Sequence, residues 1–347
     1  MTTRELLNEL QNWNEHELFY YNYYIAKNSK NFQEFLNTLD TEYLKKKMLI
    51  VPEIKDGFMP DFVTDADYFF DKNSQNNVIL TKHNRYTPAF FHSHQFFELI
   101  YVLKGSCRQN IAYEQIDLKE GDFCLVSPST SHSIEVFNNS LIINILIRRG
   151  SFEDIFYNVL KDTNKVSQFF NSSLYSKKNN AYLIMESKND NTIKEHVLSM
   201  YIEYTERKKY YENILDSSLM ILFSKLLQQY ENTMKLPGEV RKSSALFSDI
   251  MAYFDANYQT ISLNDIARHF HFSTAYCSRL IKKHTGKSFT QLQQSIRFNK
   301  ACFFLKHTNQ PIAEISALVG FQNVEHFNRL FKKRYQKTPG QFRKENN

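Results

Sequence analysis

The spacing of hydrophobic and polar residues changes three times along the chain. Residues 1–76 carry apolar side chains at helical spacing, which predicts a helical segment. Residues 77–150 instead contain short apolar runs separated by Gly105, Gly121 and Pro128, a pattern typical of a small all-β unit such as a barrel. We expect strands in this unit at 78–81, 97–103, 123–126 and 141–147.

Helical spacing returns in residues 151–232, which we expect to form a helical bridging region. Two apolar stripes stand out there, one between Ile193 and Tyr204 and the other between Leu215 and Leu226. Such helices pack either inside one molecule or across a homodimer, and the pattern allows both. The polar stretch 233–244 is the best candidate for a linker to a last domain at 245–345.

That last domain contains an internal repeat. The motif Arg-Leu-apolar-Lys-Lys occurs at 279–283 and again at 329–333. Each copy is predicted to form a short helix, a tight turn and a second helix, over about 263–284 and 312–335. The residues expected to cap or break these helices are Ser262, Ser273, Gly286, Pro311, Gly320 and Asn323.

The second helix of each copy has an apolar face and a polar, mostly basic face. In the first copy the polar face carries Ala275, Ser278, Arg279 and Lys282, and in the second it carries Glu325, Arg329 and Lys332. Arginine can pair with guanine in the major groove, and lysine can neutralise phosphates. A solvated basic face is the alternative for either copy alone, but two copies at matched offsets favour contact with double-stranded DNA.

Charge is distributed unevenly in a way that supports this interpretation. The chain has a net charge of +6, yet the stretch from Arg241 to the end holds 17 basic and 6 acidic residues. The rest of the chain is therefore acidic overall. Such asymmetry is typical of a module that binds a polyanion joined to a part with another task.

These motifs resemble the AraC/XylS family of bacterial regulators over about residues 245–343. The residues that carry the resemblance are Ile266, Ala267, Ser273, Ser278, Arg279, Lys282, Lys283, Gly286, Arg297, Ala301, Ile312, Gly320, Phe321, Phe327, Arg329, Phe331, Lys332, Thr338 and Pro339. The resemblance implies a seven-helix domain in which a long helix, at about 289–307, joins two helix-turn-helix units. It implies that both second helices enter successive major grooves of promoter DNA.

The resemblance also assigns contacts within each unit. Its base-facing positions fall on Ala275, Ser278, Arg279, Val324, Glu325, His326 and Arg329, and we add Lys282, Lys283 and Lys332 to the expected DNA-contacting set. Three residues depart from the family pattern: Cys277 replaces a usual leucine, Ser316 an alanine and Gln336 a glycine. Because the side chains around Arg279 and Arg329 differ, we expect two different half-sites.

The β unit carries a second resemblance, to the two cupin motifs. His92, His94, Glu98 and His132 match the positions of the cupin metal ligands. In an extended strand, however, His94 and Glu98 would lie roughly 13 Å apart, so one ion could hold both only if the chain bends between them. We therefore expect these four residues, with Tyr101, to line an effector pocket or to serve the structure, and we expect no metal or cofactor.

The remaining features bound the protein's location and class. The four cysteines have no metal-binding spacing, the first ten residues contain Glu5 and Glu9 where a signal peptide would be apolar, and no stretch could span a bilayer. We predict a cytoplasmic α+β protein with a cupin-like barrel and an all-α DNA-binding domain. It would be an effector-responsive regulator, with RNA polymerase as a partner if it is an activator. The rival interpretations are a metal-dependent cupin enzyme fused to a DNA-binding domain and a non-specific architectural DNA binder.

Overall fold

The computed structural model confirms an α+β fold and divides the chain into two compact units. The first contains residues 1–160, 164–169 and 179–237, and the second contains 161–163, 170–178 and 238–347. The residues that the structure describes are 1–54, 56–58, 62–63, 70, 76–111, 114–150, 155, 164–175, 182–236, 250–251, 253–254, 256–285 and 287–346.

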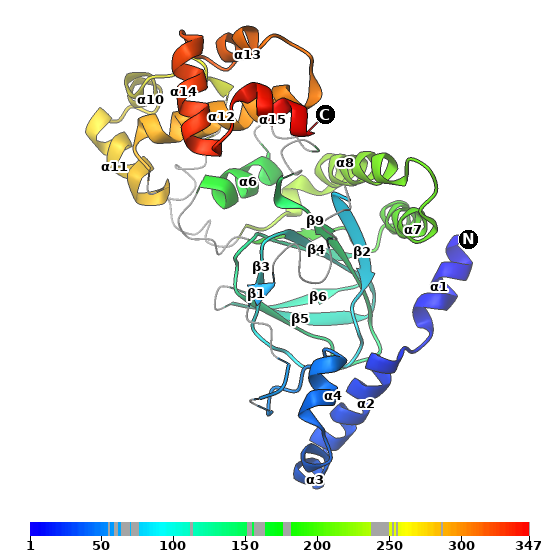
Figure 1. Cartoon of the computed structure of the whole chain (residues 1–347). Coiled ribbons are helices and arrows are strands. Elements are labelled where there is room, and N and C mark those ends of the chain that lie inside the picture. The colour runs from blue at the N-terminus through cyan, green and yellow to red at the C-terminus, as the bar shows by residue number, and fades with distance from the viewer. Residues whose placement is uncertain are drawn as a thin grey trace. The chain divides into compact units, whose positions relative to one another are not determined.

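The first unit begins with four helices, which lie in the first part of the predicted helical segment 1–76, whereas Phe62–Val63 of that segment form a short strand (Figure 1). They are α1 (Thr3–Gln11), α2 (Glu15–Lys27), α3 (Phe32–Asn37) and α4 (Thr41–Lys46). Both α1 and α2 start at capping boxes, formed by Thr2 with Glu5 and by Asn14 with Glu17. Glu17 is fully buried and forms an ion pair with Arg85, whose Nη2 lies 2.8 Å from Glu17 Oε2. This pair ties α2 to the loop that follows the first long strand.

Strands make up the centre of the first unit. They are β1 (Phe62–Val63), β2 (Val78–Lys82), β3 (Ser93–His94), β4 (Phe97–Lys104), β5 (Ser106–Ile111), β6 (Glu114–Lys119), β7 (Asp122–Val126), β8 (His132–Glu135), β9 (Leu141–Ile147) and β10 (Tyr182–Glu186). One sheet has the order β10-β7-β4-β9-β2 and a second has the order β6-β5-β8, while β1 pairs with β3. The four predicted strands are all present as β2, β4, β7 and β9.

Strand β10 is a correction to the predicted all-helical region 151–232. It pairs antiparallel with β7 and aligns Tyr182 with Val126. Its five residues are too few to show an alternation of apolar and polar side chains. They form a strand because they pair with the free edge of β7, a partner distant in the sequence. Lys235, within the predicted linker, is bonded through its backbone to Ile184, and the linker residues from 237 onward lie outside the described part of the chain.

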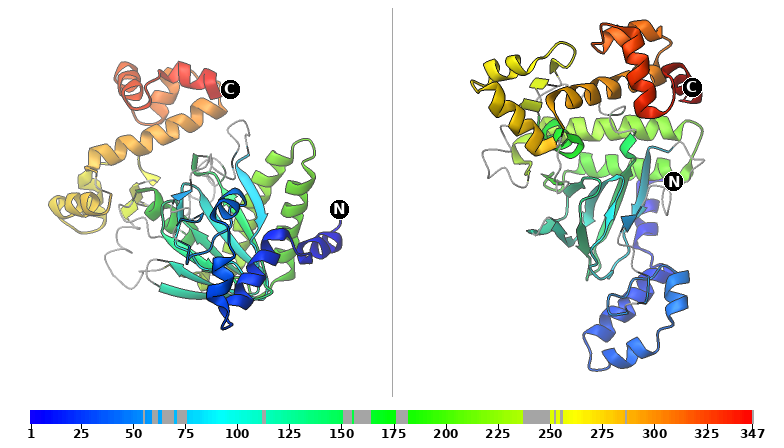
Figure 2. Two further views of the ribbon diagram at one scale, coloured as in Figure 1. Left: turned by 60° about the horizontal axis from the view of Figure 1, so that its bottom comes forward. Right: turned by 60° about the vertical axis from the view of Figure 1, so that its left-hand side comes forward.

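The two sheets enclose an apolar core, and one face of β4 lines it. Ile100 and Val102 of β4 pack there with Cys107, Ile111 and residues of β7, β8 and β9. On the outside of the larger sheet, α7 (Asn191–Glu206) and α8 (Tyr211–Tyr230) pack against each other and against β2 (Figure 2). Most of both predicted apolar stripes is buried within this single chain, so they contribute to an intramolecular core, whereas Tyr201 and Tyr204 at the end of the first stripe are half-buried. The short helices α6 (Lys165–Tyr175) and η2 (Glu231–Thr233) flank them in sequence.

The second unit is helical and follows the predicted repeat. Its helices include α10 (Leu263–His269), α11 (Thr274–Thr285), α12 (Phe289–His307), α13 (Ile312–Leu318), α14 (Val324–Tyr335) and α15 (Pro339–Asn346). One apolar core forms around Ile266, Cys277 and Ile281, and another around Ile315, Phe327 and Phe331. Helix α12 has the predicted bounds and joins the two (Figure 1). Gly286, the predicted end of α11, lies outside the described residues. None of the described helices is long and apolar enough to cross a membrane.

Candidate DNA interface and effector site

Helices α11 and α14, called the reading helices below, each bury one side and leave the other open. In α11, Cys277, Leu280 and Ile281 are buried, whereas Arg279 and Lys282 are exposed. Ala275 and Lys283 are also exposed, and Ser278 is half-buried. The predicted contact residues of the first helix-turn-helix therefore lie on the open side, where a DNA groove could reach them.

Helix α14 repeats this arrangement with different chemistry. Asn323 caps it by accepting hydrogen bonds from the backbone N–H groups of Glu325 and His326, at 2.8 and 3.0 Å. Glu325, His326, Arg329 and Lys332 are exposed, and Val324 is half-buried. Leu330, expected on the core side, is only partly buried. The open side of α14 thus offers an acceptor and several donors, while α11 offers small groups beside its arginine.

A tight turn with positive φ precedes each reading helix. In the second helix-turn-helix this turn contains Gly320, with φ +91°. In the first it contains a non-glycine residue, His271, with φ +56°. Glycine is required at 320 because an added Cβ would lie 2.5 Å from the backbone oxygen of Gln259. The two turns are therefore built alike but differ in how closely another segment approaches them.

Arg297 connects the two helix-turn-helix units, a role that its place in the family pattern did not reveal. From α12 its guanidinium donates hydrogen bonds to the backbone oxygens of Tyr258 and Gln259, at 3.2 and 2.7 Å. Gln259 in turn donates from Nε2 to the backbone oxygen of Leu318, at 2.7 Å. The segment before the first unit is thereby fixed to the turn of the second. The link therefore joins α12, the segment before the first helix-turn-helix unit and the end of α13.

In the first unit of the chain, the predicted effector residues meet at one carboxylate. Glu98 Oε2 lies 3.1 Å from His132 Nε2 and 3.3 Å from His94 Nε2. His92 pairs with His132 through a backbone bridge, and their rings lie 4.4 Å apart. The chain bends between β3 and β4, which brings His94 to Glu98 and removes the expected separation of about 13 Å along an extended strand. These residues, with Asn144, are called the polar cluster below.

Asn144 contacts Glu98 although it was not predicted to do so, whereas Tyr101 was predicted to join the pocket and lies elsewhere. Asn144 of β9 donates to Glu98 Oε1 at 2.9 Å, although it was not predicted as a site residue. Its signal was that it interrupts the apolar run of β9 with an amide. Tyr101 stacks on Phe123 and is three residues from Glu98, so the alternation of side chains in β4 places it on the opposite face. The prediction that Tyr101 joins the pocket was wrong.

Backbone carbonyls fix the orientation of the histidine rings. His94 Nδ1 lies 2.8 Å from the oxygen of Phe96, and His132 Nδ1 lies 3.0 Å from the oxygen of Thr130. A carbonyl only accepts, so each Nδ1 carries the proton and each Nε2 faces Glu98. The two Nε2 atoms and the carboxylate oxygen converge, and a cation or a strong hydrogen-bond donor lying among them would contact all three. The polar cluster therefore suits a positively charged or donor-rich guest.

Electrostatics at the polar cluster agree with this geometry. Burial opposes ionisation of Glu98, but the hydrogen bond with His132 and the nearby ring of His94 hold the pKa of its carboxyl well below the ordinary value. Burial, followed by the neighbouring His132, lowers the pKa of His92 to about 3. Glu98 is thus a carboxylate, and His92 offers a neutral ring. Ligand atoms of His92, Glu98 and His132 all lie within 4.8 Å of one another, which is compatible with one metal ion.

Comparison with known proteins matches these two parts of the chain. The helix-turn-helix domain model matches residues 266–345, and the AraC-like ligand binding domain model matches residues 77–148. The chain is 25% identical over 263 residues to the uncharacterized HTH-type transcriptional regulator YfiF of Bacillus subtilis, covering 74% of this chain and 79% of that protein. It is 22% identical over 253 residues to the HTH-type transcriptional activator RhaS of Enterobacter sp., covering 73% of this chain and 86% of that protein.

Among solved structures, the C-terminal domain of AraT, a response regulator from Geobacillus stearothermophilus, is similar to part of this chain. It is 31% identical, covers 30% of this chain and 88% of that one, and has a TM-score of 0.29. The two domain models fall on the β unit with its polar cluster and on the paired reading helices. The chain therefore belongs to the AraC/XylS family of transcription regulators, with an AraC-like ligand-binding domain ahead of a helix-turn-helix DNA-binding domain.

Proposed function

We propose that this regulator reads two different half-sites of a promoter, one with α11 and the other with α14. The observation that carries this proposal is that both reading helices are open on their basic side, while hydrogen bonds of Arg297 and Gln259 tie α12 and the end of α13 to the segment before the first helix-turn-helix unit. A fixed spacing between two readers selects DNA in which the half-sites have a matching spacing.

The side chains of the reading helices suggest what each half-site contains. Arg279 and Arg329 can each pair with a guanine through two hydrogen bonds. Glu325 can accept from a cytosine amino group, and Ala275 is small enough to contact a thymine methyl group. Lys282, Lys283 and Lys332 are assigned to phosphates, where they add affinity without sequence preference.

Selection from a random double-stranded DNA pool with the full chain tests this proposal. We expect a motif with two unlike half-sites. Arg279→Ala should relax the sequence preference in one half-site and Arg329→Ala in the other. Each substitution should weaken the free energy of binding to the selected duplex by about 1–3 kcal/mol. Lys283→Ala is the matched control, because it should weaken selected and scrambled duplexes equally. Parallel loss of selected and scrambled binding in the arginine variants would overturn the assignment.

The polar cluster suggests how the ligand-binding domain responds to an effector. Its charged and polar side chains lie in the barrel, and a guest that changes their hydrogen bonds would shift the balance between two states of the domain. We propose that this shift alters DNA binding in the bacterial cytoplasm, with RNA polymerase and a second copy of the chain as partners. The relatives named above are regulators, so we propose no enzymatic reaction.

A divalent transition metal is the second candidate for the guest, and the polar cluster fits it. His94 Nε2 is buried and has no hydrogen-bond partner in the described part of the chain, and His92, Glu98 and His132 offer converging ligand atoms. A bound ion would contact both ring nitrogens and the carboxylate oxygen, which converge. The carbonyl contacts of the Nδ1 atoms would hold the rings in the tautomer that a metal needs.

Metal analysis of the purified chain separates this candidate from a purely organic effector. About one equivalent of metal in the wild type, lost in His132→Ala and kept in His196→Ala, would support it. His196 is a suitable control because it lies in α7, away from the polar cluster. Its Nε2 is 2.8 Å from the backbone oxygen of Ser218 in α8. A wild-type chain that takes up no iron, manganese or zinc at equilibrium would exclude the metal.

A further inference from the structure

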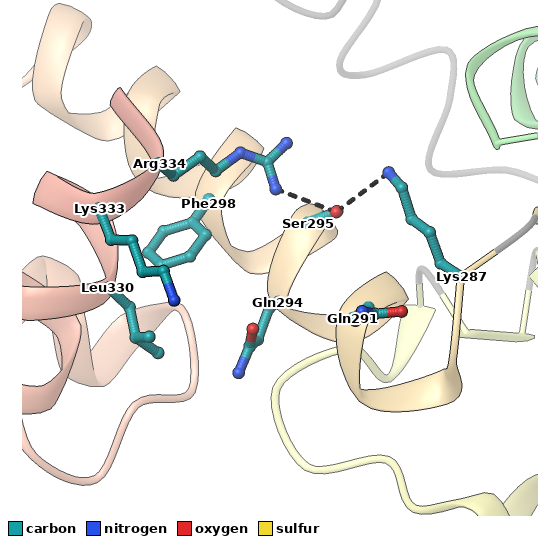
Figure 3. A pocket seen from close by; sticks show the side chains of 8 residues that line it. All are labelled: Lys287, Gln291, Gln294, Ser295, Phe298, Leu330, Lys333 and Arg334. Carbon is teal, nitrogen blue, oxygen red and sulfur yellow. Dashed lines mark hydrogen bonds between the residues drawn. The ribbon is translucent and has the colours of Figure 1, made fainter. Parts of the chain in front are cut away.

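A second concentration of positive charge lies outside the faces of the reading helices. A pocket of about 540 Å³ opens between α12 and α14 and is lined by eight described residues (Figure 3). Three of them, Lys287, Lys333 and Arg334, are cationic, and none of the eight is a carboxylate. None of these three cations was assigned to the predicted DNA contacts. This cavity is called the basic pocket below.

Two cationic side chains of the basic pocket donate hydrogen bonds to the same uncharged oxygen. Ser295 Oγ accepts hydrogen bonds from Lys287 Nζ at 3.2 Å and from Arg334 Nη1 at 3.0 Å. Figure 3 shows the two side chains reaching Ser295 from opposite sides. Ser295 is only 4% exposed, so its position is fixed by the packing of α12. Two like charges are thereby held within roughly 6 Å of each other, an arrangement that favours an anion beside them.

The surrounding sequence strengthens the positive field. No aspartate or glutamate occurs between Asp265 and Glu314, a stretch that holds eight lysines and arginines. Arg334 also lies over the ring of Phe298, 5.8 Å from its centroid, which keeps the guanidinium at the pocket wall. The pocket thus combines fixed donors with a local excess of positive charge, as phosphate sites do.

The place of the basic pocket in the domain indicates where the phosphate comes from. Lys333 lies one helical turn beyond Arg329 in α14, and Lys287 lies in the segment that leads from α11 into α12, so the pocket is lined by one reading helix and by the segment that follows the other. A duplex whose successive major grooves received α11 and α14 would present its backbone to the connecting helix α12. We propose that the basic pocket binds a phosphate of the DNA backbone between the two half-sites. This proposal rests on the proposed function.

Salt dependence of DNA binding by the full chain tests the proposal. Binding of the selected duplex and of a scrambled duplex is followed by fluorescence anisotropy between 50 and 300 mM salt. Each of Lys287→Ala and Lys333→Ala should weaken both duplexes about equally, by roughly tenfold, and reduce the slope of log affinity against log salt by about one. Ser295→Ala keeps every charge, so it should weaken both duplexes a few-fold and leave the slope unchanged.

Lys300→Ala is the matched control. Lys300 belongs to the same helix but lies over the ring of Tyr258, 5.8 Å from its centroid, and does not line the pocket. Wild-type slopes and affinities in the two pocket variants would overturn the proposal while leaving DNA binding intact. Failure of the wild type to bind any duplex would instead refute the proposed function.

A second measurement distinguishes backbone phosphate from a free phosphate. Without DNA, the melting temperature of the full chain is followed with inorganic phosphate or pyrophosphate at millimolar concentration. We expect at most a small rise, because one phosphate of a duplex gains most of its affinity from its neighbours. A large rise in the wild type that Lys287→Ala abolishes, together with an unchanged salt slope, would mean that the pocket serves a free phosphate and would overturn the DNA assignment.

Discussion

Replacing Gly320 with alanine tests how tightly the second helix-turn-helix is built. An alanine at φ +91° would suffer about 1–2 kcal/mol of left-handed strain. Its Cβ would also lie 2.5 Å from the backbone oxygen of Gln259 and 3.1 Å from Arg297 Nε. That oxygen accepts from Arg297 and cannot move freely, so the clash adds on the order of 1–3 kcal/mol. Reduced freedom of the unfolded chain returns about 0.4–1 kcal/mol. We expect a net loss of about 3 kcal/mol.

Hydrogen exchange measured by mass spectrometry on the full chain is the suitable assay, because a chain with two units need not unfold in one step. Peptides from α13 and α14 should exchange roughly a hundredfold faster in Gly320→Ala, while peptides from the β-sheets serve as an internal reference. His271→Gly is the matched control, since it relieves a left-handed residue in the corresponding turn and should not accelerate exchange in α11. Exchange in α13 and α14 within threefold of the wild type would refute the close approach of Gln259 to Gly320.

Three further predictions concern stability in both units. Ser316→Ala should raise the free energy of unfolding by about 1 kcal/mol in denaturant titrations, because Ser316 Oγ is buried without a hydrogen-bond partner in the described part of the chain; destabilisation would show that the hydroxyl is satisfied. Gln336→Gly should raise the free energy of unfolding by about 0.5–1 kcal/mol, because Gln336 ends α14 at φ +59°, a left-handed conformation that glycine adopts without strain. An unchanged or lower melting temperature would contradict this. Glu17→Gln should cost about 3 kcal/mol at neutral pH, since it breaks the buried pair with Arg85. Burial opposes ionisation of Glu17, but hydrogen bonds from Arg85 and Lys82 lower its pKa below 4.5, so its stabilisation is present above pH 4.5 and is lost as pH falls below that value. The difference in melting temperature between wild type and Glu17→Gln should therefore shrink on acidification, and a difference independent of pH would refute this assignment.

The sequence by itself determined the elements whose causes are local. Helices α10, α11, α13 and α14 begin at the residues that were expected to cap or open them, and their buried faces follow from the spacing of apolar residues within each helix. The exposed positions of Arg279 and Arg329 were predictable for the same reason. The apolar strands β2, β4, β7 and β9 were predictable too, because β-branched and aromatic runs bounded by turn residues carry their own signal.

Only the tertiary structure decided features that depend on residues distant in the chain. Strand β10 exists because β7 offers an edge to it, and Glu98 meets His94, His132 and Asn144 because the chain bends before β4. No local period encodes such a meeting, so Asn144 was missed and Tyr101 was wrongly included. The same holds for the link from Arg297 to Gln259 and for the shared contact of Lys287 and Arg334 with Ser295. Hydrogen bonds of these kinds join segments tens of residues apart, and their partners become neighbours only when the helices and sheets pack.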